Sequence, residues 1–154
     1  MREEIRTFIN YMEEEKHASK NTTLSYQSDL LKMADYLEEN GITDCGKVTK
    51  TALNSYILFL EKEGKAASTV SRALASTRSF FGWLFKEGRI RRDPADSMHA
   101  PKIEKKVPVI LTVDEVTKLL EQPSGANPKE IRDKAMLELL YATGIRVTEL
   151  VNLK

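Results

Sequence analysis

Cysteine is almost absent from this chain, because Cys45 is the only one among 154 residues. A single thiol cannot form a disulfide within the chain, which fits a protein of a reducing compartment. Cys45 is also a poor candidate for a catalytic nucleophile, since the only histidines are His17 and His99 and no metal-ligand spacing occurs. We therefore expect Cys45 to be an inert thiol, either structural or partly exposed.

Long apolar runs are missing as well. No stretch approaches the roughly 20 apolar residues that span a bilayer, and the N-terminal MREEIRTFINYMEEEK is too acidic for a signal peptide. Strand-like alternation, internal repeats and low-complexity tracts are also lacking. With 41% hydrophobic and 31% charged residues, the composition is that of a soluble globular protein. We expect an all-α cytoplasmic protein with no metal, no cofactor and no membrane partner.

A large charge of one sign is absent overall, since the formal net charge is only +1. The charge is nevertheless unevenly distributed. Residues 1–64 hold 8 Lys/Arg and 12 Asp/Glu, residues 65–106 hold 10 and 4, and residues 107–154 hold 6 and 7. The middle of the chain is therefore basic, which makes a polyanionic partner such as nucleic acid possible there.

Apolar residues recur at spacings of three and four, which predicts four helices before residue 90. The expected helices lie near 2–15, from Asn21 or Thr22 to Gly41, over 49–63, and over 68–87. In the second helix, Asn21 or Thr22 is the expected N-cap, and the expected buried stripe consists of Leu24, Leu31, Ala34 and Leu37. Four amphipathic helices with short loops predict a compact helical domain over residues 1–88.

A different pattern follows. Residues 89–110 contain three prolines, many cations and no helical stripe, so we expect an extended basic linker. Thr112 with Glu115 predicts a capping box, Asn127 with Pro128 predicts a second helix start, and Gly144 predicts its end. Residues 111–154 are too few to bury these apolar helices. We therefore expect the incomplete start of a larger domain, frayed when it stands alone.

The fourth helix has one apolar side and one polar side. A helical wheel places Ala73, Leu74, Thr77, Phe80, Phe81, Leu84 and Phe85 on the apolar side. Arg72, Ala75, Ser76, Ser79 and Lys86 fall on the opposite side, with Arg78 at the border. Small residues between cations allow a helix to enter the major groove of DNA, although an ordinary solvated face has the same pattern. Trp83 also falls on the polar side, where we expect it to dock against another element.

The run IRDKAMLELLYATGIRVTELVNL resembles the segment around the first catalytic arginine of the tyrosine recombinases, the phage-integrase family, and is most similar to the bacterial Xer recombinases. Three earlier segments continue the resemblance: NTTLSYQSDL, STVSRALASTRSFFGWL and DPADSMHAPKIEKKVPVILTVDEV. The resemblance implies a four-helix SAM-like core-binding domain, a linker, and the truncated start of a catalytic domain. In the family a tyrosine forms a 3′-phosphotyrosyl link with DNA, without metal or ATP.

The resemblance also implies roles for individual residues. Arg146 matches the first catalytic arginine, and Glu149 is expected to support it. An arginine fork can hold two phosphate oxygens and stabilise the charge of the transition state. The expected DNA contacts, from the resemblance and the basic stripe together, are Asn21, Thr22, Tyr26, Lys65, Ser68, Arg72, Ser76, Arg78, Arg89, Arg91, Arg92, Lys102 and Lys105.

The family's other catalytic groups lie downstream of this arginine, and Tyr141 precedes it, so we expect the chain to bind DNA without recombining it. The expected partners are double-stranded DNA with inverted-repeat half-sites and, for the full-length parent, further recombinase protomers in a homotetramer or a paired paralogue. Two alternatives remain open. The chain is a natural truncated regulator or decoy of a recombinase, or it is a non-enzymatic all-α module that binds an acidic protein.

Overall fold

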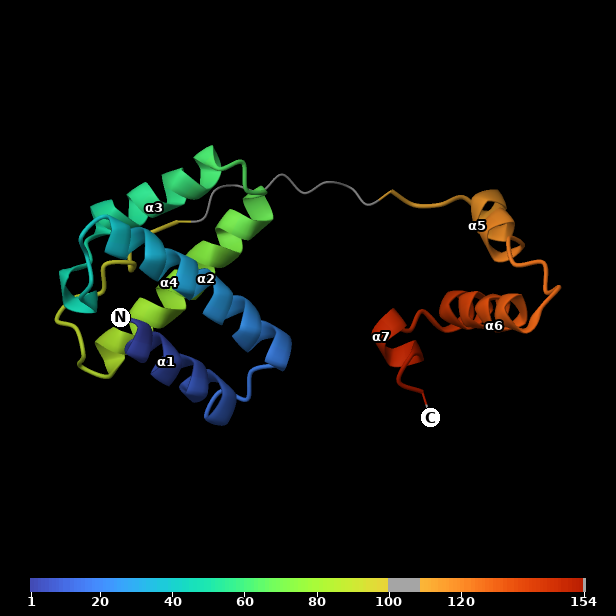
Figure 1. The fold of residues 1–154 in the computed structure, drawn as a ribbon, viewed down its shortest axis with the longest axis horizontal. Coiled ribbons are helices and arrows are strands. Elements are labelled where there is room, and N and C mark those ends of the chain that lie inside the picture. The colour runs from blue at the N-terminus through green and yellow to red at the C-terminus, as the bar shows by residue number, and fades with distance from the viewer. Residues whose placement is uncertain (100–108, 154) are drawn as a thin grey trace. The chain divides into compact units, whose positions relative to one another are not determined.

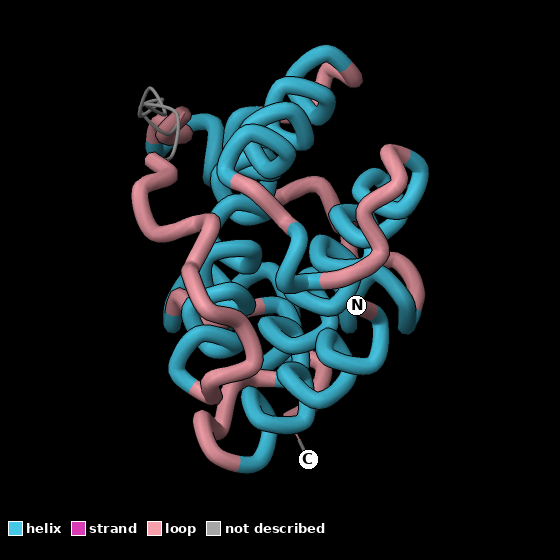
Figure 2. Tube along the Cα trace, turned by 90° about the vertical axis from the view of Figure 1, so that its left-hand side faces the viewer, coloured by secondary structure: helices cyan, strands magenta, loops and turns pink. Residues whose placement is uncertain are grey.

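The computed structural model describes residues 1–99 and 109–153, and within them all regular structure is helical (Figures 1 and 2). The elements are α1 (Arg2–Glu14), α2 (Lys20–Glu39), the 3₁₀ helix η1 (Cys45–Lys47), α3 (Lys50–Lys62), α4 (Ala67–Lys86), α5 (Val113–Leu120), α6 (Pro128–Thr143) and α7 (Val147–Leu150). This confirms the all-α prediction. The chain divides into two units, residues 1–104 and 105–154, and each is described by itself.

Two helices of the first unit, α2 and α3, begin at hydroxyl caps. Thr49 caps α3, because its Oγ1 accepts a hydrogen bond of 3.2 Å from the amide of Ala52. Ser19 caps α2, because its Oγ accepts a hydrogen bond of 3.3 Å from the amide of Thr22. The expected cap at Asn21 or Thr22 is therefore wrong, and both residues lie in the first turn of the helix.

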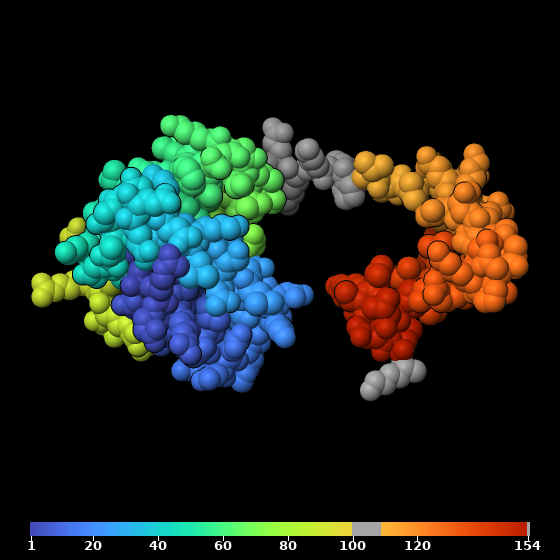
Figure 3. Space-filling view, viewed as in Figure 1, coloured from blue at the N-terminus to red at the C-terminus, as the bar shows by residue number. Residues whose placement is uncertain are grey.

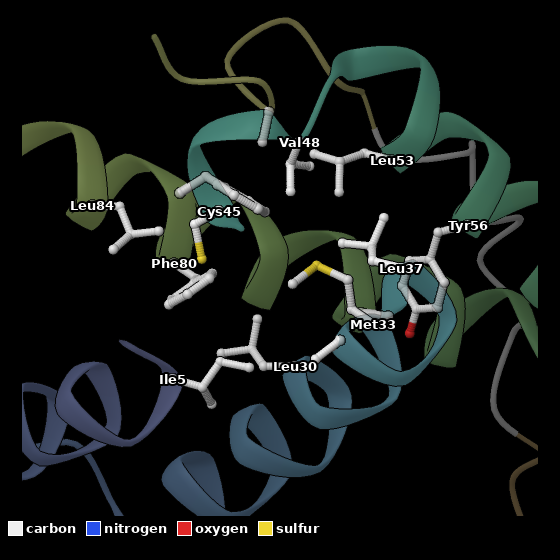
Figure 4. Close-up of a cluster of buried hydrophobic side chains, with 14 of the residues drawn as sticks. Ile5, Leu30, Met33, Leu37, Cys45, Val48, Leu53, Tyr56, Phe80 and Leu84 are labelled. Carbon is white, nitrogen blue, oxygen red and sulfur yellow. The ribbon is translucent and has the colours of Figure 1, made fainter. Parts of the chain in front are cut away.

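The core of the first unit lies between α1, α2, α3 and α4 (Figure 4). Its largest fully buried side chains are Tyr56, Phe8, Phe80, Phe81, Ile5, Leu30, Met33, Leu37, Leu53, Leu74, Leu84 and Val70. Phe8 of α1 meets the edge of Phe80 of α4 at a ring-centroid distance of 5.5 Å. Figure 3 shows α1 and α2, in blue, joined into one continuous surface.

On α2 and α4, the buried side of the helix differs in part from the expected one. On α2 the buried residues are Thr23, Asp29, Leu30, Met33, Ala34 and Leu37. Leu24 is exposed and Leu31 only half-buried, so the predicted stripe is wrong at these two positions. On α4 Phe85 is exposed, whereas Ser76 and Trp83 are buried. A side chain's depth depends on the neighbouring helices, which a wheel of one helix does not include.

Residues 89–99 pack onto the first unit. Gly88 takes a left-handed φ of 66°, and the amide of Arg89 donates to the carbonyl of Leu84 at 2.9 Å, which turns the chain back after α4. Ile90, Ala95 and Met98 are then buried in the same core. The expectation of an extended linker from residue 89 onward is therefore wrong for residues 89–99.

The second unit shows the predicted helix boundaries. Thr112 and Glu115 form the expected capping box of α5, and Asn127 caps α6 with Pro128 in its first turn. Gly144 ends α6 with a left-handed φ of 65°. Most large apolar side chains here are exposed, and within residues 109–153 Leu150 is the only one buried. The apolar surfaces of α5, α6 and α7 are thus largely exposed among the described residues.

Candidate nucleic-acid interface

The solvent side of α4 presents small residues between cations. Arg72, Ala75, Arg78 and Lys86 are exposed, and Ser79 and Gly82 are half-buried. Their spacing of three and four places them along one side of a 20-residue helix. The predicted small and cationic face is therefore present, with one exception at Ser76.

Ser76 does not belong to this surface. Its side chain is fully buried, and its hydroxyl donates a 2.9 Å hydrogen bond to the carbonyl of Ala73 in the preceding turn. The expectation that Ser76 faces DNA is wrong, because the position turns toward the interior. Ala75 is the exposed small residue at this level of the helix.

Trp83 docks against α1, as expected. Its ring lies 5.5 Å from the ring of Phe8 and 5.8 Å from that of Tyr11. The guanidinium of Arg89 lies over the indole ring of Trp83, with Cζ 5.0 Å from the ring centroid. Trp83 thus joins the end of α4 to α1, while Arg89 stays exposed above it.

The starts of α2 and α4 lie at the same end of the first unit. Arg72 reaches Asp29, and four or five residues later Thr77 reaches Met33, so the two helices run in the same direction where they touch. In Figure 1 both run from right to left across the unit. The exposed residues Asn21, Lys65 and Ser68 and the half-buried Thr22 and Tyr26 therefore share one end of the unit with Arg72.

The ion pair of Arg72 and Asp29 connects these two helix starts. Nη1 of Arg72 donates to Oδ2 of Asp29 at 2.6 Å and to the carbonyl of Ser25 at 3.2 Å. The Arg72 side chain is 41% exposed, whereas that of Asp29 is 4% exposed. Burial raises the pKa of Asp29 above its ordinary value, and the charge of Arg72 offsets this only in part.

A second cationic region surrounds the segment after α4. Arg89, Arg91 and Arg92 line a groove of about 820 Å³ together with Lys47 of η1 and Lys50 of α3. The three arginines were predicted from the sequence, but the two lysines were not, because they lie about 40 residues earlier and only the fold brings them to this groove. Lys102 and Lys105, the remaining expected contacts, lie outside the described residues.

Arg146 lies on the short turn between α6 and α7. Its side chain is 82% exposed, and its Nη1 donates to Oε1 of Glu149 at 3.2 Å. The backbone amide of Arg146 donates to the other carboxylate oxygen, Oε2, at 2.8 Å. Glu149 therefore holds both the backbone and the guanidinium of Arg146, and the left-handed Gly144 sets the direction in which the turn leaves α6.

Comparison with known proteins decides the family. Residues 5–88 match the phage integrase N-terminal SAM-like domain, and residues 110–154 match the phage integrase family. The chain belongs to the phage integrase family. It is 42% identical over 147 residues to a protein of Caldanaerobacter subterraneus named as a tyrosine recombinase, covering 96% of this chain and 50% of that protein. It is 38% identical to the tyrosine recombinase XerD of Listeria monocytogenes, covering 100% and 52%.

The tyrosine recombinase XerC of Roseiflexus castenholzii is also 38% identical, with 99% of this chain and 49% of that protein covered. The chain thus spans about half the length of the curated relatives it matches. For this phage integrase family member, the SAM-like match to residues 5–88 falls within the first unit, and the match to residues 110–154 falls within the second unit. Among the residues described, no helix is long and apolar enough to cross a membrane.

Proposed function

We propose that this chain is the DNA-binding portion of a Xer-like tyrosine recombinase. The observation that carries the proposal is the exposed face of α4, in which small residues lie between cations and Arg72 is anchored to the start of α2. A helix with such a face can approach the base edges of the major groove while cations contact the phosphates. Membership of the phage integrase family supports DNA as the partner.

The contacts divide by chemistry. Near the starts of α2 and α4, we assign to the bases and nearby phosphates Asn21, Thr22, Tyr26, Ser68 and Arg72. Lys65, Arg78, Arg89, Arg91 and Arg92 are exposed cations that neutralise phosphates. We extend this phosphate contact to Lys102 and Lys105. Ser76 is excluded because it is buried.

In the full-length enzyme we assign Arg146 to the scissile phosphate. Its guanidinium keeps free N–H donors beyond the single one used for Glu149, so it can hold nonbridging oxygens as charge develops on them. Glu149 is the supporting residue, because it fixes the turn and the guanidinium together. The nucleophile is a tyrosine that lies outside residues 1–154. Residues 1–154 by themselves bind DNA and do not cleave it.

The biological setting follows from the same proposal. The full-length enzyme cuts and rejoins DNA at inverted-repeat half-sites in the cytoplasm, as a homotetramer or together with a paralogue. Resolution of joined chromosomes, which serves chromosome partition at cell division, and integration of a mobile element both fit this chemistry.

The test is fluorescence anisotropy of the chain with a labelled duplex carrying a Xer-type half-site and with a scrambled duplex. We expect tighter binding to the half-site and an affinity that falls with salt, with a log–log slope near −0.9 per neutralised phosphate. Arg72→Ala should weaken binding about tenfold. Binding of neither duplex, together with capture by an acidic protein, would support an interaction module in place of a DNA reader.

A further inference from the structure

The pairing of Arg72 with Asp29 leaves one edge of the guanidinium free. Among the residues that the structure describes, contacts to Arg72 use only its Nη1, which donates to the carboxylate of Asp29 and the carbonyl of Ser25. Within the described residues, Nε and Nη2 have no hydrogen-bond partner. An arginine carries five N–H donors in a rigid plane. The bonds to Nη1 therefore orient the plane and leave an intact fork directed away from them.

The two sides of the pair differ in solvent access. Asp29 is almost fully buried, whereas Arg72 remains 41% exposed at the surface. A buried carboxylate is costly unless it is paired. The group that pairs with Asp29 of α2 is Arg72 of α4. The arrangement is thus a buried carboxylate on α2 that holds a surface cation of α4 from below.

We propose that Asp29 is a positioning residue for DNA recognition, which orients the free Nε and Nη2 edge of Arg72 toward a base edge or phosphate. This inference rests on the proposed function. An arginine side chain loses rotamer entropy when it is fixed. Because the folded protein already fixes Arg72, less of that cost falls on binding. Asp29 also sets which way the fork faces, which determines the sequence discrimination of the helix.

The competing possibility is that Asp29 neutralises Arg72 and weakens DNA binding. The two roles predict opposite effects of Asp29→Asn. A positioning role predicts weaker half-site binding and a smaller ratio of half-site to scrambled affinity. A neutralising role predicts tighter binding to both duplexes, since a negative charge near DNA is removed.

The experiment is a double-mutant cycle on the full chain, with half-site and scrambled duplexes in anisotropy and thermal melting of each variant. We expect Asp29→Asn to weaken half-site binding about threefold to tenfold, and to have no further effect in an Arg72→Ala background. Asp35→Asn is the matched control, because it removes the same charge from an exposed position on α2. We expect its half-site affinity to equal or slightly exceed that of the unmodified chain.

Each other outcome is decisive. If the unmodified chain binds neither duplex, the proposed function fails and the inference falls with it. If the unmodified chain binds and Asp29→Asn binds equally or more tightly, or loses the same affinity with and without Arg72, the inference alone is overturned. Arg72→Lys is a second variant that tests the inference if Asp29→Asn fails to fold, because Arg72 is on the surface. Lysine keeps the charge without the fork, so we expect a loss similar to that of Arg72→Ala, and unmodified affinity would overturn the inference.

Discussion

At the scale of single residues, burial and pairing determine what each group can do. Asp29 is a buried acid that pairs with a surface arginine, and Cys45 is buried in the hydrophobic core (Figure 4). The hydroxyl of Tyr56 is buried, and it has no hydrogen-bond partner among the described residues. Polar groups of this kind are costly in a core, and only the one at Asp29 has a clear link to the DNA-binding face.

The pH dependence of stability should reveal the burial of Asp29. Its pKa in the folded protein is raised above the ordinary 3.8. The stability that protonated Asp29 contributes is therefore full below pH 3.8 and is lost as pH rises through the folded pKa. We expect the unfolding free energy of Asp29→Asn, relative to the unmodified chain, to rise over that interval in urea titrations. A constant difference from acid to neutral pH would contradict the raised pKa.

Cys45 should be chemically silent in the folded protein. Burial raises the pKa of its thiol to about 11, so the reactive thiolate is scarce at pH 8. We expect iodoacetamide to leave the native chain unmodified and to alkylate it fully in denaturant, as read by mass spectrometry. Rapid alkylation of the native chain would show that the core around η1 opens readily.

At the scale of elements, helix boundaries were predictable where a cap and a glycine stop mark them. Thr112, Asn127 and Gly144 act as expected, because these signals are local. The start of α2 was placed two or three residues late, since Ser19, Asn21 and Thr22 are all suitable caps by sequence. The burial of Ser76 and the exposure of Leu24 depend on neighbouring helices, so no single-helix pattern determines them.

The cap of α2 can be tested directly. Ser19→Ala removes the acceptor for the amide of Thr22, so we expect a loss of about 1 kcal/mol in unfolding free energy. Asn21→Ala is the matched control in the first turn of the same helix, with an expected change within about 0.5 kcal/mol. Urea denaturation followed by circular dichroism measures both, and a larger loss for Asn21→Ala would reverse the assignment of the cap.

At the scale of the whole molecule, the sequence predicted an N-terminal helical region, a basic segment and a second helical region, and the family comparison supports the first and third. The full extent of the first unit was not predicted from the sequence, because its last buried residues, Ile90, Ala95 and Met98, are separated by polar and basic residues. The cationic groove with Lys47 and Lys50 was missed for a related reason, since it joins distant segments.

The extent of the first unit makes a quantitative prediction. A chain ending at residue 88 loses the burial of Ile90, Ala95 and Met98, and burying an Ile or Met side chain contributes about 1.5–3 kcal/mol. We expect residues 1–99 to be more stable than residues 1–88 by about 3 kcal/mol or more, as measured by urea denaturation. Equal stability would mean that this segment adds nothing to the core.

The central claim is that the first unit contacts DNA through the starts of α2 and α4 and the exposed face of α4. Its most direct test is to titrate the ¹⁵N-labelled chain with a half-site duplex and follow amide shifts by NMR. We expect the largest shifts to cluster at Asn21, Ser68, Arg72, Ala75 and Arg78, with little change at Leu53 and Tyr56 of α3. Large shifts confined to other surfaces, or none at saturating DNA, would contradict it.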